Sequence, residues 1–310
     1  MISLEQEVES DDIDDMALEG LTEGGNSQER EELPKKQRFN FVVVGLIVSI
    51  LGLSLVLFVV YVFGFTTLKQ ERAQRQLLNV FTTPAGAVPL SGQLPPDGSP
   101  AAILKIPAIG VNQVVVQGTT ARQTALGPGL MTQAARPGTI GNAVILGRRT
   151  TSGAPFRNLG LLHEGEAFQV ISGLGSFNYI VIQTGVVQAG AQDPASPVNR
   201  AQVTLMTSGD ANGTAGSLYV VGRQTNAPGA AKKPKYQPAS YERGLSGDPS
   251  AIPASILLGL VYCAGIVFTV LAYRRYRQSL WTVYVLSTPI LLALAFWWFE
   301  NLYLLLPSTM

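Results

Sequence analysis

The chain has 310 residues, of which 22 are basic and 21 acidic, so its formal net charge is only +1. Charged residues make up 14% of the sequence and the mean hydropathy is positive at +0.23, which indicates membrane-spanning segments. The single cysteine, Cys263, and the single histidine, His163, exclude a disulfide within the chain and a metal site built from several histidines or cysteines. We therefore expect no metal ion and no other cofactor.

The first 38 residues are strongly acidic. Twelve of the 21 acidic residues lie within residues 1–32, which contain one base, Arg30, and few apolar or aromatic side chains. A segment of this composition cannot bury enough apolar surface to offset the entropy lost on folding. Residues 1–38 are therefore predicted to be a disordered segment.

Three segments are long and apolar enough to cross a bilayer, namely residues 39–65, 254–273 and 280–306. Each meets the requirement of roughly 20 apolar residues. The first follows a polar leader of 38 residues and is longer than the apolar core of a signal peptide. We interpret it as an uncleaved anchor, which gives a multi-pass protein whose first partner is the lipid bilayer.

Basic residues beside the spans predict their orientation. One group precedes the first span and another fills the short loop between the last two spans: Lys35, Lys36 and Arg38, then Arg274, Arg275 and Arg277. The positive-inside rule places both groups in the cytoplasm. The N-terminal segment is then cytoplasmic, and residues 66–253 are extracytoplasmic. Three lysines within residues 232–235 conflict with this assignment, but they lie some 20 residues from the next span, where the rule weakens.

The region outside the membrane divides into two linkers and a domain. Residues 66–99 begin with LKQERAQRQLLNVF, which is predicted to continue the first helix, and end in a Pro/Gly/Ser-rich tether. Residues 224–253 begin with a second Pro/Gly/Ser-containing linker. Between them, residues 100–223 have the size of an ordinary domain.

The domain is predicted to be mainly β. Short runs rich in β-branched and aromatic residues are separated by Gly, Pro and Asn: residues 101–106, 113–118, 142–147, 166–171, 177–188, 201–206 and 217–223. A short helix is expected within residues 120–126. Seven or eight strands at this spacing predict an antiparallel barrel or sandwich.

Four motifs of the domain resemble those of bacterial sortases, in particular the actinobacterial class E type. In chain order they read ILKIPAIGVNQVVVQGTT, LGPGL, GNAVILGRRTTSGAPFRNLGLL and TLMTS, and the resemblance covers about residues 101–223. It implies an eight-stranded sortase-like β-barrel, anchored by the three membrane helices at the surface of a Gram-positive bacterium.

The resemblance also implies a chemistry. Sortases cut a sorting signal such as LPxTG with a cysteine thiolate, move the proton with a histidine, and stabilise substrate and oxyanion with an arginine. Carried over motif by motif, the histidine position is Arg148 in LGRRTT, the cysteine position is Ser208 in TLMTS, and the arginine position is Ser217 in SLYVV. Arg223 would lie at the other end of that last strand. None of the three catalytic residues is therefore intact.

Two hypotheses remain. In the first, the domain has lost transpeptidase chemistry and acts as a scaffold or binding module for other membrane proteins, cell-wall proteins or peptides, with no nucleic-acid partner. Residues that could line its groove are Arg148, Arg149, Thr207, Ser208, Asp210 and Arg223. In the second, Ser208 is the nucleophile of an active sortase-family transpeptidase or hydrolase, assisted by Asp210 and Arg148. A relocated base at His163 would favour the second hypothesis, whereas an exposed turn is the simpler interpretation of that residue.

Residues 306–310 read LPSTM, which resembles a sorting signal. The motif lacks the glycine and a following apolar tail, so coincidence is the simpler interpretation.

Overall fold

The structure is a computed structural model that describes residues 35–83, 95–187, 193–210, 216–227, 247–275 and 280–309. Residues 1–34 of the segment predicted to be disordered and most of the linker 224–253 lie outside these residues. Residues 35–38 of that segment were predicted to be disordered but form the first turn of a helix, α2 (Lys35–Val60). The chain divides into two units, Met1–Val48 and Ser49–Met310. The contacts given below all lie within the second unit.

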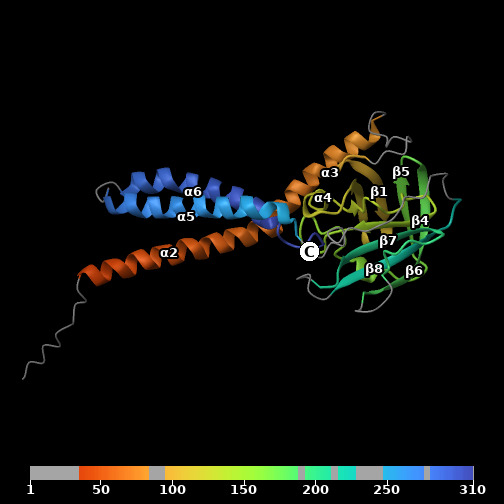
Figure 1. Cartoon of the computed structure of the whole chain (residues 1–310), viewed down its shortest axis with the longest axis horizontal. Helices are drawn as coiled ribbons and strands as arrows, with labels where there is room; N and C mark the ends of the chain where they lie inside the picture. The colour runs from red at the N-terminus through yellow and green to blue at the C-terminus, as the bar shows by residue number, and fades with distance from the viewer. Residues whose placement is uncertain are drawn as a thin grey trace, which may run out of the picture. The chain divides into compact units, whose positions relative to one another are not determined.

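Eight strands close into one barrel in the order β1-β2-β3-β4-β7-β8-β6-β5, which confirms the predicted fold class (Figure 1). Neighbouring strands are antiparallel except for the pairs β2–β3 and β4–β7, which are parallel. The strands are β1 (Pro100–Ile106), β2 (Val111–Gln117), β3 (Gly129–Leu130), β4 (Gly141–Leu146), β5 (Ala167–Ser172), β6 (Gly175–Val186), β7 (Ala201–Ser208) and β8 (Ser217–Gln224).

The bounds of the expected strands differ from the observed ones by one or two residues, and two differences matter for the site and the closure of the barrel. β3 has only two residues and was not predicted, because no alternating pattern can be read from so short a run in LGPGL. β7 was expected to end at residue 206 but continues through Ser208, because Ser208 pairs with Ser217 on β8. The site position at 208 is therefore the last residue of a strand.

Strand β7 is buried on both faces. Val203 and Leu205 point into the barrel core, while Met206 belongs to a second apolar cluster outside the barrel with Val144 and Leu146 of β4. Every residue of β7 from position 202 to 208 is buried. This double burial explains why the strand reads as an apolar run with small polar residues rather than as a clean alternation. The packing on both faces also holds the last residues of β7 in place, and the site lies at this end of the strand.

The helices lie before, between and after the strands. α2 (Lys35–Val60), the π-helix η1 (Tyr61–Phe65) and α3 (Thr66–Thr82) form one continuous helical run, as predicted for the segment after the first span. The short helix α4 (Ala121–Thr124) follows β2, and 3-10 turns occur at η2 (Pro107–Ile109), η3 (Leu159–Leu161) and η5 (Pro249–Ala251). The last two helices are α5 (Ile252–Arg275) and α6 (Leu280–Tyr303).

Three helices within the described residues are long and apolar enough to cross a membrane: Ile47–Thr82, Pro249–Ala272 and Val285–Tyr303. α5 and α6 pack side by side (Figure 1), with Gly259 against Trp298 and Gly265 against Leu291. Small residues at such positions let two helices approach closely in lipid. Most other apolar side chains of these helices are exposed, as expected for a lipid-facing surface.

Candidate functional site

The ends of β4 and β7 bring two of the predicted site positions together. The two strands run parallel with Leu146 opposite Met206, so the residues that follow lie side by side. The Gly147 amide donates to the Met206 carbonyl at 3.0 Å, and the Thr207 hydroxyl donates to the Gly147 carbonyl at 2.8 Å. Across the other edge of β7, Ser208 is paired with Ser217. The positions Arg148, Ser208 and Ser217 therefore gather at one end of the barrel.

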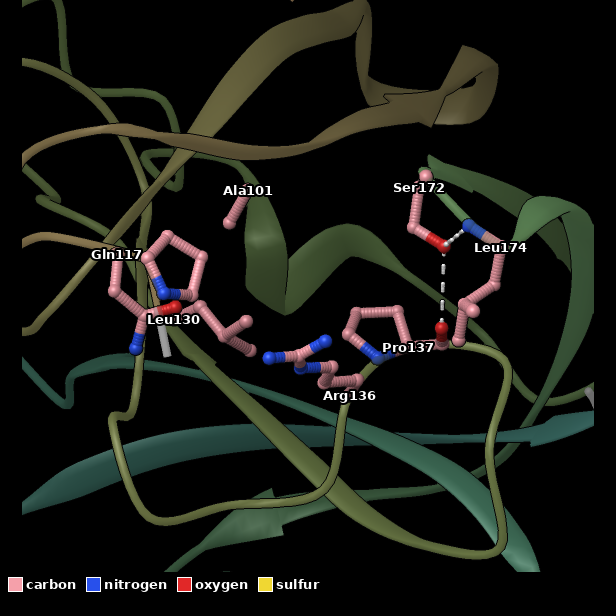
Figure 2. Close-up of a pocket in the computed structure, with 9 residues that line it drawn as sticks. Ala101, Gln117, Leu130, Arg136, Pro137, Ser172 and Leu174 are labelled. Carbon is pink, nitrogen blue, oxygen red and sulfur yellow. Dashed lines mark hydrogen bonds between the residues drawn. The ribbon is translucent and has the colours of Figure 1, made fainter. Parts of the chain in front are cut away.

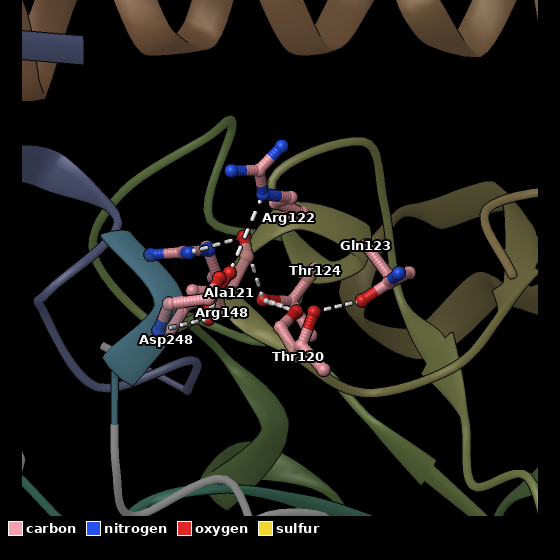
Figure 3. A network of polar contacts seen from close by, with 8 residues as sticks. Thr120, Ala121, Arg122, Gln123, Thr124, Arg148 and Asp248 are labelled. Carbon is pink, nitrogen blue, oxygen red and sulfur yellow. Dashed lines mark hydrogen bonds and ion pairs between the residues drawn. The ribbon is translucent and has the colours of Figure 1, made fainter. Parts of the chain in front are cut away.

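Arg148 is completely buried. Its guanidinium donates to the Ala121 carbonyl at the start of α4 at 3.0 Å (Figure 3). It also donates to the Thr151 hydroxyl at 3.0 Å. Its Cζ lies 4.7 Å from the centre of the Tyr303 ring, which is a cation–π contact. No described carboxylate lies within ion-pair distance of it, and its Nε has no hydrogen-bond partner among the described residues.

Burial lowers the pKa of Arg148, and Tyr303 opposes this shift. An arginine guanidinium nevertheless stays protonated in proteins, so Arg148 is a donor with no lone pair to accept a proton. In Figure 3 the neighbouring Arg122 pairs instead with Asp248 at 3.3 Å. The position that matches the family's histidine therefore holds a fixed cation within the fold.

The Ser208 hydroxyl is also buried, and the hydrogen bonds given for it in the described part of the chain go to backbone carbonyls. Its Oγ donates to the carbonyl oxygens of Asp210 at 2.8 Å and of Thr309 at 3.2 Å. Backbone carbonyls accept a hydrogen bond but do not take the proton, so they do not raise the nucleophilicity of the hydroxyl in the way an imidazole would. The Asp210 residue contributes its backbone oxygen to this contact.

The Arg149 side chain contacts the backbone at the end of β7. One terminal guanidinium nitrogen donates to the carbonyl oxygens of Ser208 at 2.8 Å and Gly209 at 2.7 Å. Its backbone amide donates to the Thr309 carbonyl at 3.1 Å. The side chain thus fixes the turn after β7, and the main chain contributes a donor to the site.

Two sequence candidates lie away from this cluster. Arg223 is opposite Gln202 in the β7–β8 ladder, six residues along β8 from Ser217, so it is not brought to the Ser208 end of the barrel.

His163 is exposed in a turn before β5, where its amide donates to the Glu166 carboxylate at 2.9 Å. β8 and β6 separate β5 from β7 in the barrel. Among the described residues, no hydrogen bond joins the His163 imidazole to Ser208.

Two residues that sequence reasoning did not assign to the site come from the far end of the chain. Tyr303, the last residue of α6, packs its ring on Arg148 and its hydroxyl against that of Ser152. Thr309 places its carbonyl on Ser208 and on the Arg149 amide. The only sequence signal for Thr309 was the LPSTM motif, and no local pattern pointed to Tyr303.

The cavities near and away from the site differ in size. A cavity of about 220 Å³ adjoins the cluster and is lined by residues of the first helical run, the α4 region and the end of α6, including Tyr61, Lys69, Arg122, Glu300 and Tyr303. A second cavity of about 30 Å³ lies at Gln117, Leu130, Arg136 and Pro137, with Ser172 bonded to the Pro137 carbonyl (Figure 2). The second has room for only one or two water molecules. Within the described ranges, no cluster of His, Cys, Asp and Glu could hold a metal ion.

Solved sortase structures align with part of the chain. The sortase D5 transpeptidase of Clostridium perfringens aligns with a TM-score of 0.43 and 19% identity, over 51% of this chain and 98% of that one. Sortase E of Streptomyces avermitilis aligns with a TM-score of 0.37 and 26% identity, over 43% of this chain and 91% of that one.

Sequence comparison covers the same region. Sortase D of Bacillus subtilis (strain 168) is 31% identical over 93 residues, which are 30% of this chain and 46% of that protein. The chain thus spans less than half the length of this curated relative. The sortase domain family model matches residues 104–225, from within β1 to the residue after β8. Residues 104–225, which make up most of the barrel, therefore form a sortase domain.

Proposed function

We propose that this chain is a membrane-anchored protein whose sortase domain does not catalyse transpeptidation and acts as a binding or scaffold module at the bacterial cell surface. One observation carries the proposal: the Ser208 hydroxyl, at the end of β7, bonds only to the two backbone carbonyls of Asp210 and Thr309 among the described residues. A serine needs a partner base to attack a carbonyl at neutral pH.

The neighbouring positions support this proposal. Arg148 cannot act as a general base, and it is buried under Tyr303 rather than directed at Ser208. Ser217 offers a neutral hydroxyl where the family resemblance expects an arginine to stabilise charge. Loss of the nucleophile, the proton carrier and the cation together, on a barrel that keeps its closure, favours a role in binding.

The family type and topology belong to the same proposal. We take the domain to be of the actinobacterial class E type, as the motifs suggest, with a cytoplasmic N-terminal segment and an extracytoplasmic barrel in a Gram-positive bacterium. Basic residues beside the spans support this orientation. Partners would be other membrane proteins, cell-wall proteins or peptides that reach the outer face of the membrane.

The test is an assay of the full chain in lipid nanodiscs. Peptides carrying an LPxTG signal are incubated with a soluble amine, and cleavage and ligation are followed by mass spectrometry. We expect no product above the level without protein. Ser208→Cys is expected to remain inactive as well, because no group at position 148 can take up and return the proton.

The alternative is an active enzyme in which Ser208 attacks the substrate. Turnover by the natural chain that is lost in Ser208→Ala would establish this alternative and overturn the proposal. Turnover by Ser208→Cys alone would refute our explanation of the defect at position 148.

A further inference from the structure

The cavity of about 220 Å³ carries three charged groups, each from a different part of the chain. They are Lys69 of α3, Arg122 of α4 and Glu300 of α6. None of the three takes part in the hydrogen bonds given above for the ends of β4 and β7. The cavity has room for a small polar group together with several water molecules. It is therefore a candidate binding site separate from the Ser208 position.

The cavity lies where the apolar spans end. The apolar run of the first span stops at Phe65, and Lys69 follows one helical turn later. Glu300 lies in the last turn of α6, at the end of the candidate span Val285–Tyr303. Tyrosines and charged side chains at the ends of spans are typical of the layer of lipid headgroups. We therefore expect the headgroups of membrane lipids to reach this cavity.

Arg122 has free donors at the cavity. Its Nε donates to the Asp248 carboxylate at 3.3 Å, and most of its side chain is exposed. Its two terminal nitrogens have no hydrogen-bond partner among the described residues, and in Figure 3 they point away from the other side chains drawn. A guanidinium with free terminal N–H groups can bind two oxygens of one phosphate.

Lys69 and Glu300 form the second charged part of the cavity. The Lys69 Nζ lies 2.8 Å from Oε1 of Glu300 and 3.4 Å from the Tyr61 hydroxyl. The other carboxylate oxygen of Glu300 accepts no hydrogen bond within the described part of the chain. It can therefore accept one from a ligand, and the Lys69 ammonium can attract a phosphate. Both side chains are about half exposed, so their pair can rearrange around a ligand at little cost.

The charges at the cavity favour a zwitterion. The cations Lys69 and Arg122 are each paired with a carboxylate, Glu300 and Asp248 respectively, so the four charges sum to zero. Such a site does not attract a group with a large net charge of either sign. It is complementary to a ligand whose phosphate meets the cations and whose ammonium meets a carboxylate.

An apolar surface continues from the cavity along the spans. The Tyr61 ring lines the cavity and contacts the rings of Phe65 and Phe296, with centroids 6.3 Å and 4.9 Å apart. Both phenylalanine rings are exposed. An acyl chain can pack on these rings while the headgroup attached to it enters the cavity. This surface favours a lipid over a soluble phosphate compound.

We propose that this cavity binds the headgroup of a glycerophospholipid that carries ethanolamine. The phosphate is held by the terminal nitrogens of Arg122 and by the Lys69 ammonium, and the ethanolamine ammonium donates to the free oxygen of Glu300. The acyl chains pack on Phe65 and Phe296. Because α3, α4 and α6 each supply one polar ligand, the bound lipid joins the barrel to the spans on both sides of it in the sequence.

Native mass spectrometry of the full chain in a mild detergent tests the site. The delipidated protein is titrated with phosphatidylethanolamine, phosphatidylcholine or phosphatidylglycerol of identical acyl chains, and the complex with one lipid is quantified. We expect phosphatidylethanolamine to bind roughly tenfold more tightly than the other two, because only its headgroup has an ammonium N–H to donate to Glu300. Inorganic phosphate at the same concentration should not displace it.

Substitutions assign the binding to individual residues. Arg122→Gln should weaken the binding of phosphatidylethanolamine by about tenfold or more, because it removes the phosphate donors. Glu300→Gln should reduce that binding to the level of phosphatidylcholine. Asp248→Asn removes the charge of the partner of Arg122 but keeps the guanidinium, so it should bind as the natural chain does. Arg75→Gln, at an exposed position of α3, is the matched control and should also leave binding unchanged.

Four results would overturn the proposal. Equal binding of the three phospholipids would show that the site does not recognise ethanolamine, and displacement by inorganic phosphate would show that it is not specific for a lipid. Unchanged binding in Arg122→Gln would exclude the guanidinium as the phosphate ligand. Equal weakening in Asp248→Asn and Arg122→Gln would assign the effect to the ion pair rather than to the free nitrogens. The substituted side chains are largely exposed, so the variants are expected to fold.

Discussion

The residue at position 148 determines whether a side chain at this end of the barrel can transfer a proton. An imidazole there could accept and return a proton near neutral pH, whereas a guanidinium cannot. The Arg148 side chain instead carries structural contacts: it joins α4, the loop after β4 and the end of α6 through Ala121, Thr151 and Tyr303. Arg148, which the motifs align with the histidine of sortases, is thus part of the packing around the site.

This role predicts a loss of stability on truncation. Arg148→Ala leaves a cavity and removes the hydrogen bonds from the guanidinium to the Ala121 carbonyl and the Thr151 hydroxyl, so we expect a loss of about 2–5 kcal/mol in the free energy of unfolding. Thermal unfolding of the full chain in detergent measures the change. Arg157, an exposed arginine nearby, provides the control, and Arg157→Ala should stay within about 0.5 kcal/mol. Equal stability of the two variants would refute a structural role for Arg148.

At the scale of elements, the strands could be predicted from local sequence patterns, whereas contacts between distant parts of the chain could not. Seven strands and α4 were predicted from alternation, β-branched residues and turn residues, because these signals lie within each short run. The site positions 148, 208 and 217 were assigned by motif, and the strand register brings them to one end of the barrel, which does not test their roles. The contacts of Tyr303 and Thr309 could not be predicted, because they join residues more than 100 positions apart and depend on how α6 approaches the barrel.

The short strand β3 contains a close backbone contact that the sequence pattern does not predict. Gly129 lies against the Gly118 backbone so closely that an added Cβ would be 2.3 Å from the Gly118 oxygen. β3 bridges β2 and β4, so this close approach completes the closure of the barrel. A glycine in LGPGL that reads as part of a turn is in fact required by the packing of two backbones.

Substitution of this glycine should therefore destabilise the barrel. Gly129→Ala forces a shift of backbone rather than of a flexible side chain, and we expect a loss of roughly 2–4 kcal/mol. In Gly160→Ala the added methyl would meet only a Leu218 methyl group at 3.3 Å, so that variant should lose less than about 1 kcal/mol. Comparison of the two unfolding midpoints tests the argument. A Gly160→Ala variant less stable than Gly129→Ala would contradict it.

For the molecule as a whole, the ends of the helical spans meet the barrel in the same region. Asp248, just before α5, pairs with Arg122 after β2, and Tyr303, at the end of α6, packs on Arg148. Lys69 of α3 and Glu300 of α6 are joined by a 2.8 Å ion pair. Both side chains are about half exposed, so this pair contributes at most about 1 kcal/mol. The pair nevertheless shows that α3 lies beside the end of α6.

This arrangement and the basic loop between the last two spans predict a specific labelling pattern. In a Cys263→Ala background, Gln76→Cys on the exposed surface of α3 should react with a membrane-impermeant maleimide in intact cells. Gln278→Cys, beside Arg274, Arg275 and Arg277, should react only after permeabilisation, because the positive-inside rule keeps that loop in the cytoplasm. The unmodified chain is the control: Cys263 lies within a span and should stay unlabelled in intact cells, although α5 leaves it exposed toward lipid. Labelling of Gln278→Cys in intact cells would reverse the topology and place the barrel in the cytoplasm.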